Sequence, residues 1–172
     1  WFFVNVDAKA TLSRPVIANS PPLAFLPIRG SYVLRSKIAT PASVRVRAPA
    51  RLHLGFLDMN GALGRRFGSI GLAVDRPATR LTVTRAASNS AAGAESARVL
   101  KLMQMFARGA QSGFAIDVAE AIPAHAGLGS GTQLALAVGT AIAHLEGRKL
   151  GPQDIAGAGE RGVRSGIGLA AF

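Results

Sequence analysis

The sequence predicts an α+β domain, in which strands form a sheet that packs against helices. Three observations carry this prediction. Apolar and polar residues alternate in several segments between residues 44 and 122, which is typical of strands with one buried face. An apolar stripe at helical spacing interrupts these segments between residues 94 and 108. A glycine-rich segment then separates the last predicted strand from a long apolar helix.

Four early segments alternate in this way and are predicted as strands: 44–48, 51–56, 69–75 and 78–85. Pro49 separates the first two, and the turn-like Asp75-Arg76-Pro77 separates the other two. A glycine-rich loop over residues 60–68 is expected to join the two pairs.

A helix is predicted over residues 94–108, because four apolar side chains recur there at helical spacing: Val99, Leu102, Met103 and Phe106. A strand over residues 114–122 follows, with inward-facing Phe114, Ile116 and Val118. Asp117 and Glu120 on its other face are interpreted as solvated, and we assign them no role.

Residues 123–132 then read Pro-Ala-His-Ala-Gly-Leu-Gly-Ser-Gly-Thr. The helix behind them is predicted to end near Gly147, with an apolar stripe of Leu134, Val138, Ala141, Ile142 and Leu145. A second, shorter helix is expected after Pro152, with Asp154 in its first turn.

A strand, a glycine-rich turn and a helix N-terminus together can bind an anion, because the first helical N–H groups lack internal partners and carry partial positive charge. Gly127, Gly129 and Gly131 permit close approach of a phosphate and positive φ. Ser130 and Thr132 can cap the helix, bind phosphate oxygen or hold magnesium. A simple helix cap with a tight turn is the alternative. The spacing fits neither the Walker A loop nor the dinucleotide fingerprint.

The composition is that of a globular protein with an anionic partner. The chain has 172 residues, 49% of them hydrophobic, and no cysteine, which excludes a disulfide scaffold and a thiolate zinc site. No apolar run approaches the roughly 20 residues of a membrane span, so we expect a soluble protein. The formal net charge is +11, carried mainly by arginines, which suit phosphate and carboxylate. A solvated surface is the alternative for each single arginine.

Residues 1–43 differ from the rest, because they contain several prolines and show neither the alternation of a strand nor the 3.6-residue period of a helix. We expect a poorly ordered leader or extension there, loosely similar to a transit peptide, and assign it no function. The domain is expected over residues 44–172, which hold 15 basic and 8 acidic residues, a net of +7.

The pattern P-x-x-x-G-L-G-S-G over residues 123–131 resembles the phosphate-binding motif of the GHMP kinase superfamily, in which this loop grips the phosphates of ATP. Residues 48–69 and 161–172, together with 122–133, resemble one branch, the β-ribofuranosylaminobenzene 5′-phosphate synthase family. The resemblance implies a GHMP N-terminal domain of the ribosomal protein S5 domain 2-like fold, with a mixed sheet packed against helices. It also implies that the domain is truncated at its C-terminal end.

The resemblance further implies a transferase that condenses 4-aminobenzoate, or a related benzoate, with phosphoribosyl pyrophosphate. Carbon dioxide and pyrophosphate leave, in the first step of methanopterin biosynthesis. Such an enzyme is expected to be cytoplasmic and homo-oligomeric, to use Mg²⁺ and to take anionic small molecules. The alternatives are an ATP-dependent small-molecule kinase of the superfamily and a basic RNA-binding module. With one Trp and one Tyr in the chain, nucleic acid is not the expected partner.

By the same resemblance, the pyrophosphate is expected on a set of loop residues: Pro123, His125, Gly127, Leu128, Gly129, Ser130, Gly131 and Thr132. Ser130 or Thr132 would lie near the metal. Gly131 and Thr132 stand where GHMP kinases usually carry Ser and Ala, which favours a pyrophosphate leaving group over phosphoryl transfer. His125 would donate to phosphate as imidazolium.

Catalytic roles are expected for Arg51 and His53, which share one face of a strand, and for the nearby Asp58. A charged strand face is the alternative for the first two. Further anion-binding residues are expected at Arg65, Arg66, Arg161, Arg164 and Ser165. The alternatives are a solvated pair for the first two of these and capping of a helix C-terminus by Arg161 and Arg164.

Overall fold

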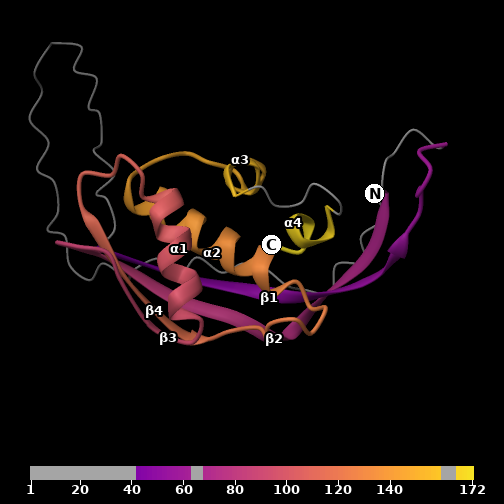
Figure 1. The fold of residues 1–172 in the computed structure, drawn as a ribbon, viewed down its shortest axis with the longest axis horizontal. Coiled ribbons are helices and arrows are strands. Elements are labelled where there is room, and N and C mark those ends of the chain that lie inside the picture. The colour runs from indigo at the N-terminus through magenta and orange to yellow at the C-terminus, as the bar shows by residue number, and fades with distance from the viewer. Residues whose placement is uncertain (1–41, 63–67, 160–165) are drawn as a thin grey trace, which may run out of the picture.

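In the computed structural model, which describes residues 42–62, 68–159 and 166–172, a single sheet is covered on one face by helices (Figure 1). The described elements follow in the order β1 (Ser43–Phe56), β2 (Ser69–Ala86), β3 (Ser90–Gly93), α1 (Ser96–Phe106), β4 (Gly113–Glu120), α2 (Ser130–Leu145), α3 (Pro152–Ala158) and α4 (Ile167–Ala170). The strand order is β1-β2-β4-β3. Neighbouring strands are antiparallel except β3 and β4, which are parallel, so the predicted mixed sheet and α+β class are confirmed.

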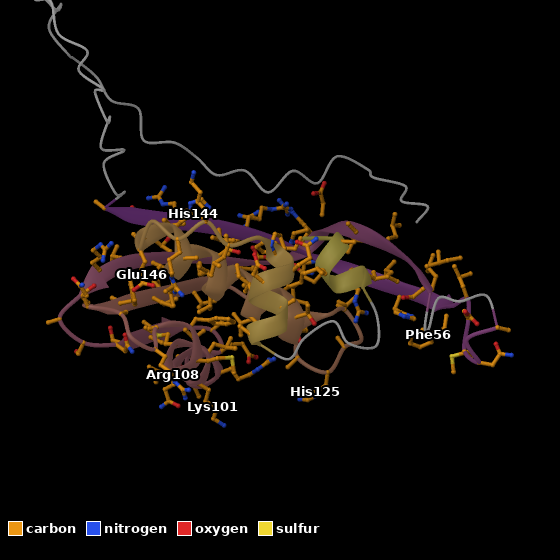
Figure 2. All side chains as sticks on the ribbon, turned by 90° about the horizontal axis from the view of Figure 1, so that it is seen from above. Phe56, Lys101, Arg108, His125, His144 and Glu146 are labelled. Carbon is orange, nitrogen blue, oxygen red and sulfur yellow. The ribbon has the colours of Figure 1, made fainter. Side chains whose placement is uncertain are left out.

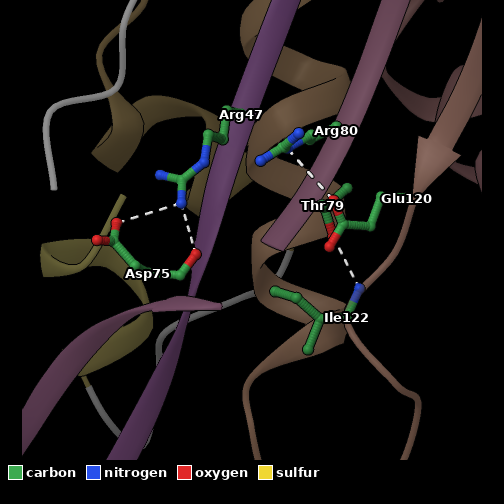
Figure 3. Close-up of polar contacts among 6 residues, drawn as sticks. All are labelled: Arg47, Asp75, Thr79, Arg80, Glu120 and Ile122. Atoms are coloured by element: carbon green, nitrogen blue, oxygen red, sulfur yellow. Dashed lines mark hydrogen bonds and ion pairs between the residues drawn. The ribbon is translucent and has the colours of Figure 1, made fainter. Parts of the chain in front are cut away.

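The two predicted strand pairs are in fact two long strands, and the turn predicted at residues 75–77 was wrong. The register of β1 against β2 moves from Pro49–Ala78 to Ala50–Val74, so residues 75–77 are extra residues within β2. A proline has no N–H to give to a ladder, and an irregularity opposite Pro49 lets both strands continue past it. Arg47 Nη2 lies 3.2 Å from Asp75 Oδ1 and ties the extra segment to β1 (Figure 3).

The core lies between the sheet and α1 and α2, as the apolar stripes predict. From the sheet, the side chains of Val46, Val83 and Ile116 are buried among others. From α1, Val99, Met103 and Phe106 are buried, and α2 is buried along almost its whole length, including every residue of its predicted stripe. The predictions for both helices and for the inward face of β4 are therefore confirmed.

β3 is a short strand that the sequence did not predict, because Ser-Ala-Ala-Gly shows neither alternation nor large apolar residues. Its place is fixed by neighbours far along the chain. Asn89 Oδ1 accepts the Phe114 N–H at 3.0 Å, and the Ala94 N–H donates to Val118 O at 3.1 Å. Gly93 lies so close to Val118 that a β-carbon there would be 2.2 Å from the Val118 carbonyl oxygen. Glycine, which has no β-carbon, is therefore needed at the end of β3.

One buried side-chain hydrogen bond connects the sheet to the segment that leaves β4. Thr79 on β2 is buried, and its Oγ1 accepts the Ile122 N–H at 3.3 Å (Figure 3). Thr79→Val keeps the shape but leaves this buried N–H without an acceptor. We expect a loss of about 1–3 kcal/mol in the free energy of unfolding, measured by urea denaturation.

The matched control for Thr79→Val is Thr82→Val on the same strand, where the side chain is only partly buried. We expect this control to unfold close to the unsubstituted protein. If both variants lose the same free energy, the hydrogen bond to Ile122 is not what stabilises this segment.

Within the described ranges, no helix is long and apolar enough to cross a lipid bilayer. Residues 1–41, in which a leader was expected, lie outside the described residues, and β1 begins at Ser43.

Candidate phosphate-binding site

The glycine-rich loop connects the end of β4 to the first turn of α2. Gly127 has φ +73° and Gly129, the N-cap residue of α2, has φ +80°. Both are in the left-handed region, which glycine adopts without steric cost. Because Gly129 is the N-cap, Ser130 is the first helical residue, and of the three roles considered for Ser130 the helix cap does not apply. Its hydroxyl lies in the first turn instead.

The start of α2 has the features of an anion site. The Thr132 and Gln133 N–H groups both donate to Gly129 O at 3.1 Å, so the helix ladder begins with these two donors. The N–H groups of Ser130 and Gly131 come before the first helical bond, where a helix leaves its donors to caps, water or ligands. The first turn carries no acidic residue that would repel an anion.

Arg51 of β1 contacts this loop directly. Its Nη1 donates to Gly127 O at 3.0 Å, and its backbone N–H donates to Leu128 O at 3.0 Å. Its side chain also lies against Gly129, where an added β-carbon would be 2.9 Å from Arg51 Nε. Arg51, for which a catalytic role was expected, thus contacts the loop through the loop backbone.

His53 lies two residues further along the same strand, where β1 pairs with Gly71 of β2. Its ring stands 4.6 Å from the ring of Phe56, measured between centroids, at 58°. His53 Nε2 is buried and makes no hydrogen bond to any described residue. Asp58, just beyond β1, is also buried, with 2% of its surface exposed.

α4 packs against the first turn of α2. Gln133 is fully buried, and its Nε2 donates to Gly168 O at 2.6 Å. Gly168 faces Thr132, whose Cγ2 would be 2.9 Å from a β-carbon at position 168. We did not predict a role for Gln133, although a single amide in an otherwise apolar helix directly after the loop was the available signal.

The remaining loop residues lie at the surface. Pro123, His125 and Gly127 are exposed, and His125 has φ +59°, a left-handed conformation that is uncommon outside glycine. Figure 2 shows His125 at the periphery of the molecule. Leu128, Gly131 and the neighbouring loop residues up to Thr132 are partly buried.

Five predicted anion-binding residues lie outside the described residues: Arg65, Arg66, Arg161, Arg164 and Ser165. Their roles stay predictions.

The described residues around the loop offer few ligands for the expected magnesium ion. Among the described residues, no three His, Asp or Glu side chains gather in a way that could hold a metal. Hydroxyls such as that of Ser130 in the first turn of α2 fit an ion that takes most of its ligands from substrate phosphates and water. Thr132 has its methyl group toward Gly168.

Comparison with known proteins defines the class. The family model described as "GHMP kinases N terminal domain" matches residues 95–172. A crystal structure of 4-(cytidine 5′-diphospho)-2C-methyl-D-erythritol kinase is similar with a TM-score of 0.53 at 21% identity, over 66% of this chain and 45% of that one. The crystal structure of the mevalonate kinase of Methanococcus jannaschii is similar with a TM-score of 0.51 at 17% identity, over 67% of this chain and 44% of that one. These two structures share the fold. Residues 95–172 therefore match the N-terminal domain of GHMP kinases, as expected from the loop motif.

Three curated relatives narrow this assignment, and all are named β-ribofuranosylphenol 5′-phosphate synthase. The protein from Archaeoglobus fulgidus is 37% identical over 135 residues, 75% of this chain and 42% of the relative. Those from Methanocaldococcus jannaschii and Methanothermobacter thermautotrophicus are 30% and 34% identical, each over 74% of this chain and 43% and 42% of the relative. The chain is therefore similar to this synthase family over about three quarters of its own length. It spans less than half the length of these relatives.

Proposed function

We propose that this chain is the diphosphate-binding part of a transferase that condenses a benzoate with phosphoribosyl pyrophosphate. The observation that carries the proposal is the glycine-rich loop at the start of α2, with its N–H donors and with Arg51 bound to its carbonyl oxygens. The family supports the choice of ligand, because its members are named for a ribofuranosyl 5′-phosphate product.

In the proposed reaction, the bond between ribose C1 and the pyrophosphate oxygen breaks and its electron pair leaves with pyrophosphate. Ribose C1 gains oxocarbenium character and forms a bond to the ring carbon that bears the carboxylate. The bond from that carbon to the carboxylate then breaks, its electrons restore the aromatic ring, and carbon dioxide leaves. The negative charge that develops on pyrophosphate is what N–H donors at a helix N-terminus stabilise.

This chain's own residues would act mainly by binding and orientation. The loop and the first turn of α2 would hold the diphosphate, with Ser130 or Thr132 supplying a hydroxyl to a magnesium ion. Bound magnesium would supply further charge stabilisation for the leaving group. We propose that the enzyme works in the cytoplasm, as a homo-oligomer, at the first step of methanopterin biosynthesis.

The name of the relatives favours one class of benzoate as the acceptor substrate. A product named as a phenol corresponds to a hydroxybenzoate that has lost carbon dioxide, whereas 4-aminobenzoate would give an aminobenzene. We therefore propose a hydroxybenzoate as the first acceptor to test, with 4-aminobenzoate beside it.

The test is release of labelled carbon dioxide from carboxyl-labelled 4-hydroxybenzoate or 4-aminobenzoate, with phosphoribosyl pyrophosphate and Mg²⁺. The assay would contain this chain together with the part of the Archaeoglobus relative that lies outside the matched 42%. Release that depends on phosphoribosyl pyrophosphate supports the proposal, and the preferred benzoate identifies the acceptor. If no carbon dioxide is released although the chain binds inorganic pyrophosphate, the site is a phosphate site but the reaction is wrong. The kinase alternative would then be tested with ATP.

A further inference from the structure

Arg51 makes contacts with three successive residues of the glycine-rich loop. The guanidinium Nη1 donates to Gly127 O, and the Arg51 backbone N–H donates to Leu128 O, both at 3.0 Å. Its Nε and Cγ lie against Gly129, at 2.9 Å and 3.0 Å from where a β-carbon would stand. Arg51 Nε is buried without a hydrogen-bond partner among the described residues. Part of this guanidinium is therefore packed on the loop.

These two hydrogen bonds fix two consecutive peptide planes. In a planar trans peptide, the carbonyl and the N–H of the next residue point in opposite directions. With the carbonyls of Gly127 and Leu128 turned toward Arg51, the N–H groups of Leu128 and Gly129 are turned away from β1. Successive N–H groups that face the same way form a concave anion-binding site.

The peptide between Gly127 and Leu128 depends most on the guanidinium. Gly127 is exposed, has φ +73°, and a β-carbon there would meet nothing within 4 Å, so the surroundings restrict this residue little. A peptide flip would present the Gly127 carbonyl to the anion in place of the Leu128 N–H. The bond to Leu128 O, in contrast, comes from the Arg51 backbone and remains when the side chain is changed.

We propose that Arg51 is a positioning residue, which holds the loop carbonyls on β1 so that the N–H groups of Leu128 and Gly129 face the diphosphate. The proposal rests on the proposed function in that the loop binds diphosphate. It assigns Arg51 an action through the loop backbone, in place of the direct catalytic contact that the sequence suggested.

The experiment uses the full 172-residue chain and inorganic pyrophosphate with Mg²⁺, with affinity measured by calorimetry. The variants are Arg51→Ala and Arg51→Lys, and the matched control is Arg45→Ala, an exposed arginine on the same strand. A second readout is the backbone amide NMR signals of Leu128 and Gly129 in the ligand-free proteins. We expect Arg51→Ala to weaken binding by about tenfold, the size of one hydrogen bond to a charged group.

We also expect Arg51→Ala to shift the Leu128 amide signal before ligand is added, and the Gly129 signal less, because its peptide stays bonded to the Arg51 backbone N–H. Arg45→Ala is expected to change neither readout. Lysine retains one donor for Gly127 O, so Arg51→Lys should recover part of the affinity. If Arg51→Ala melts at a lower temperature than the unsubstituted chain, Arg51→Lys replaces it in both measurements.

Unchanged affinity in Arg51→Ala would overturn the proposal. So would a loss of affinity with both free-state amide signals unmoved, because Arg51 would then contact the anion directly. If the unsubstituted chain does not bind pyrophosphate, the proposed function fails. In that case the free-state amide signals still decide whether Arg51 orients the loop.

Discussion

Gly129→Ala is expected to weaken pyrophosphate binding by the 172-residue chain by about tenfold or more while the domain stays folded. Gly129 has φ +80°, a conformation that costs a residue with a β-carbon about 1–2 kcal/mol. The new methyl group would also stand 2.9 Å from Arg51 Nε and 3.0 Å from its Cγ. The guanidinium would have to move away from the loop, which would release the Gly127 carbonyl. Calorimetry with inorganic pyrophosphate and Mg²⁺ measures the loss.

The matched control for this substitution is Gly109→Ala. Gly109 has φ +79°, and a β-carbon there would meet nothing within 4 Å. It therefore carries the same backbone strain without the contact to Arg51, and it lies in the connection between α1 and β4. We expect it to bind pyrophosphate like the unsubstituted chain. Undiminished binding by Gly129→Ala would show that the anion does not use this loop.

Met103→Ala is expected to cause the largest loss of stability. Met103 on α1 is fully buried in the core that lies between the sheet and α2. Removing a buried methionine side chain costs about 2–5 kcal/mol, which includes the cavity that it leaves. This is a large part of the roughly 5–15 kcal/mol that holds a domain folded. Urea denaturation followed by circular dichroism measures it.

Met105→Ala is the control for this loss, since Met105 lies on the same helix with 44% of its surface exposed. We expect it to change the free energy of unfolding by less than about 0.5 kcal/mol. Equal losses in the two variants would mean that α1 does not pack with the face that the structure assigns to it.

Local patterns predicted the helices well. The stripe of α1 and the long apolar stripe of α2 both face the core, and α3 begins at Pro152 with Asp154 accepting the Gly151 N–H at 2.8 Å. Each of these features depends on residues within a few positions of one another. Periodicity and end signals are therefore sufficient to find them.

The sheet was harder to predict because its exceptions depend on distant residues. A proline such as Pro49 interrupts the hydrogen bonding of a strand, but here the extra residues 75–77 on the partner strand let β1 continue. β3 has no pattern of its own and forms beside β4, where Gly93 fits against Val118. Neither outcome can be read from a window of neighbouring residues.

For the site, the glycine spacing predicted the loop, and the alternation along β1 predicted that Arg51 and His53 share a face. The sequence did not reveal that Arg51 contacts the loop through Gly127 O, or that Gln133 bonds Gly168 O. Both contacts are between a side chain and a backbone carbonyl. Any residue type can supply such a carbonyl, so the residue that accepts the hydrogen bond cannot be identified from its type in the sequence.

The contact from Arg51 to Gly127 also has a consequence for the order of folding, because 76 positions of chain separate the two residues. Closing so long a segment is an entropic cost that local structure does not repay. α2 and its glycines can form early, but the loop acquires its anion-binding shape only after β1 has joined the sheet. Pyrophosphate binding in this chain would therefore report the fully assembled domain, and a partly folded chain without β1 in place would be unable to bind.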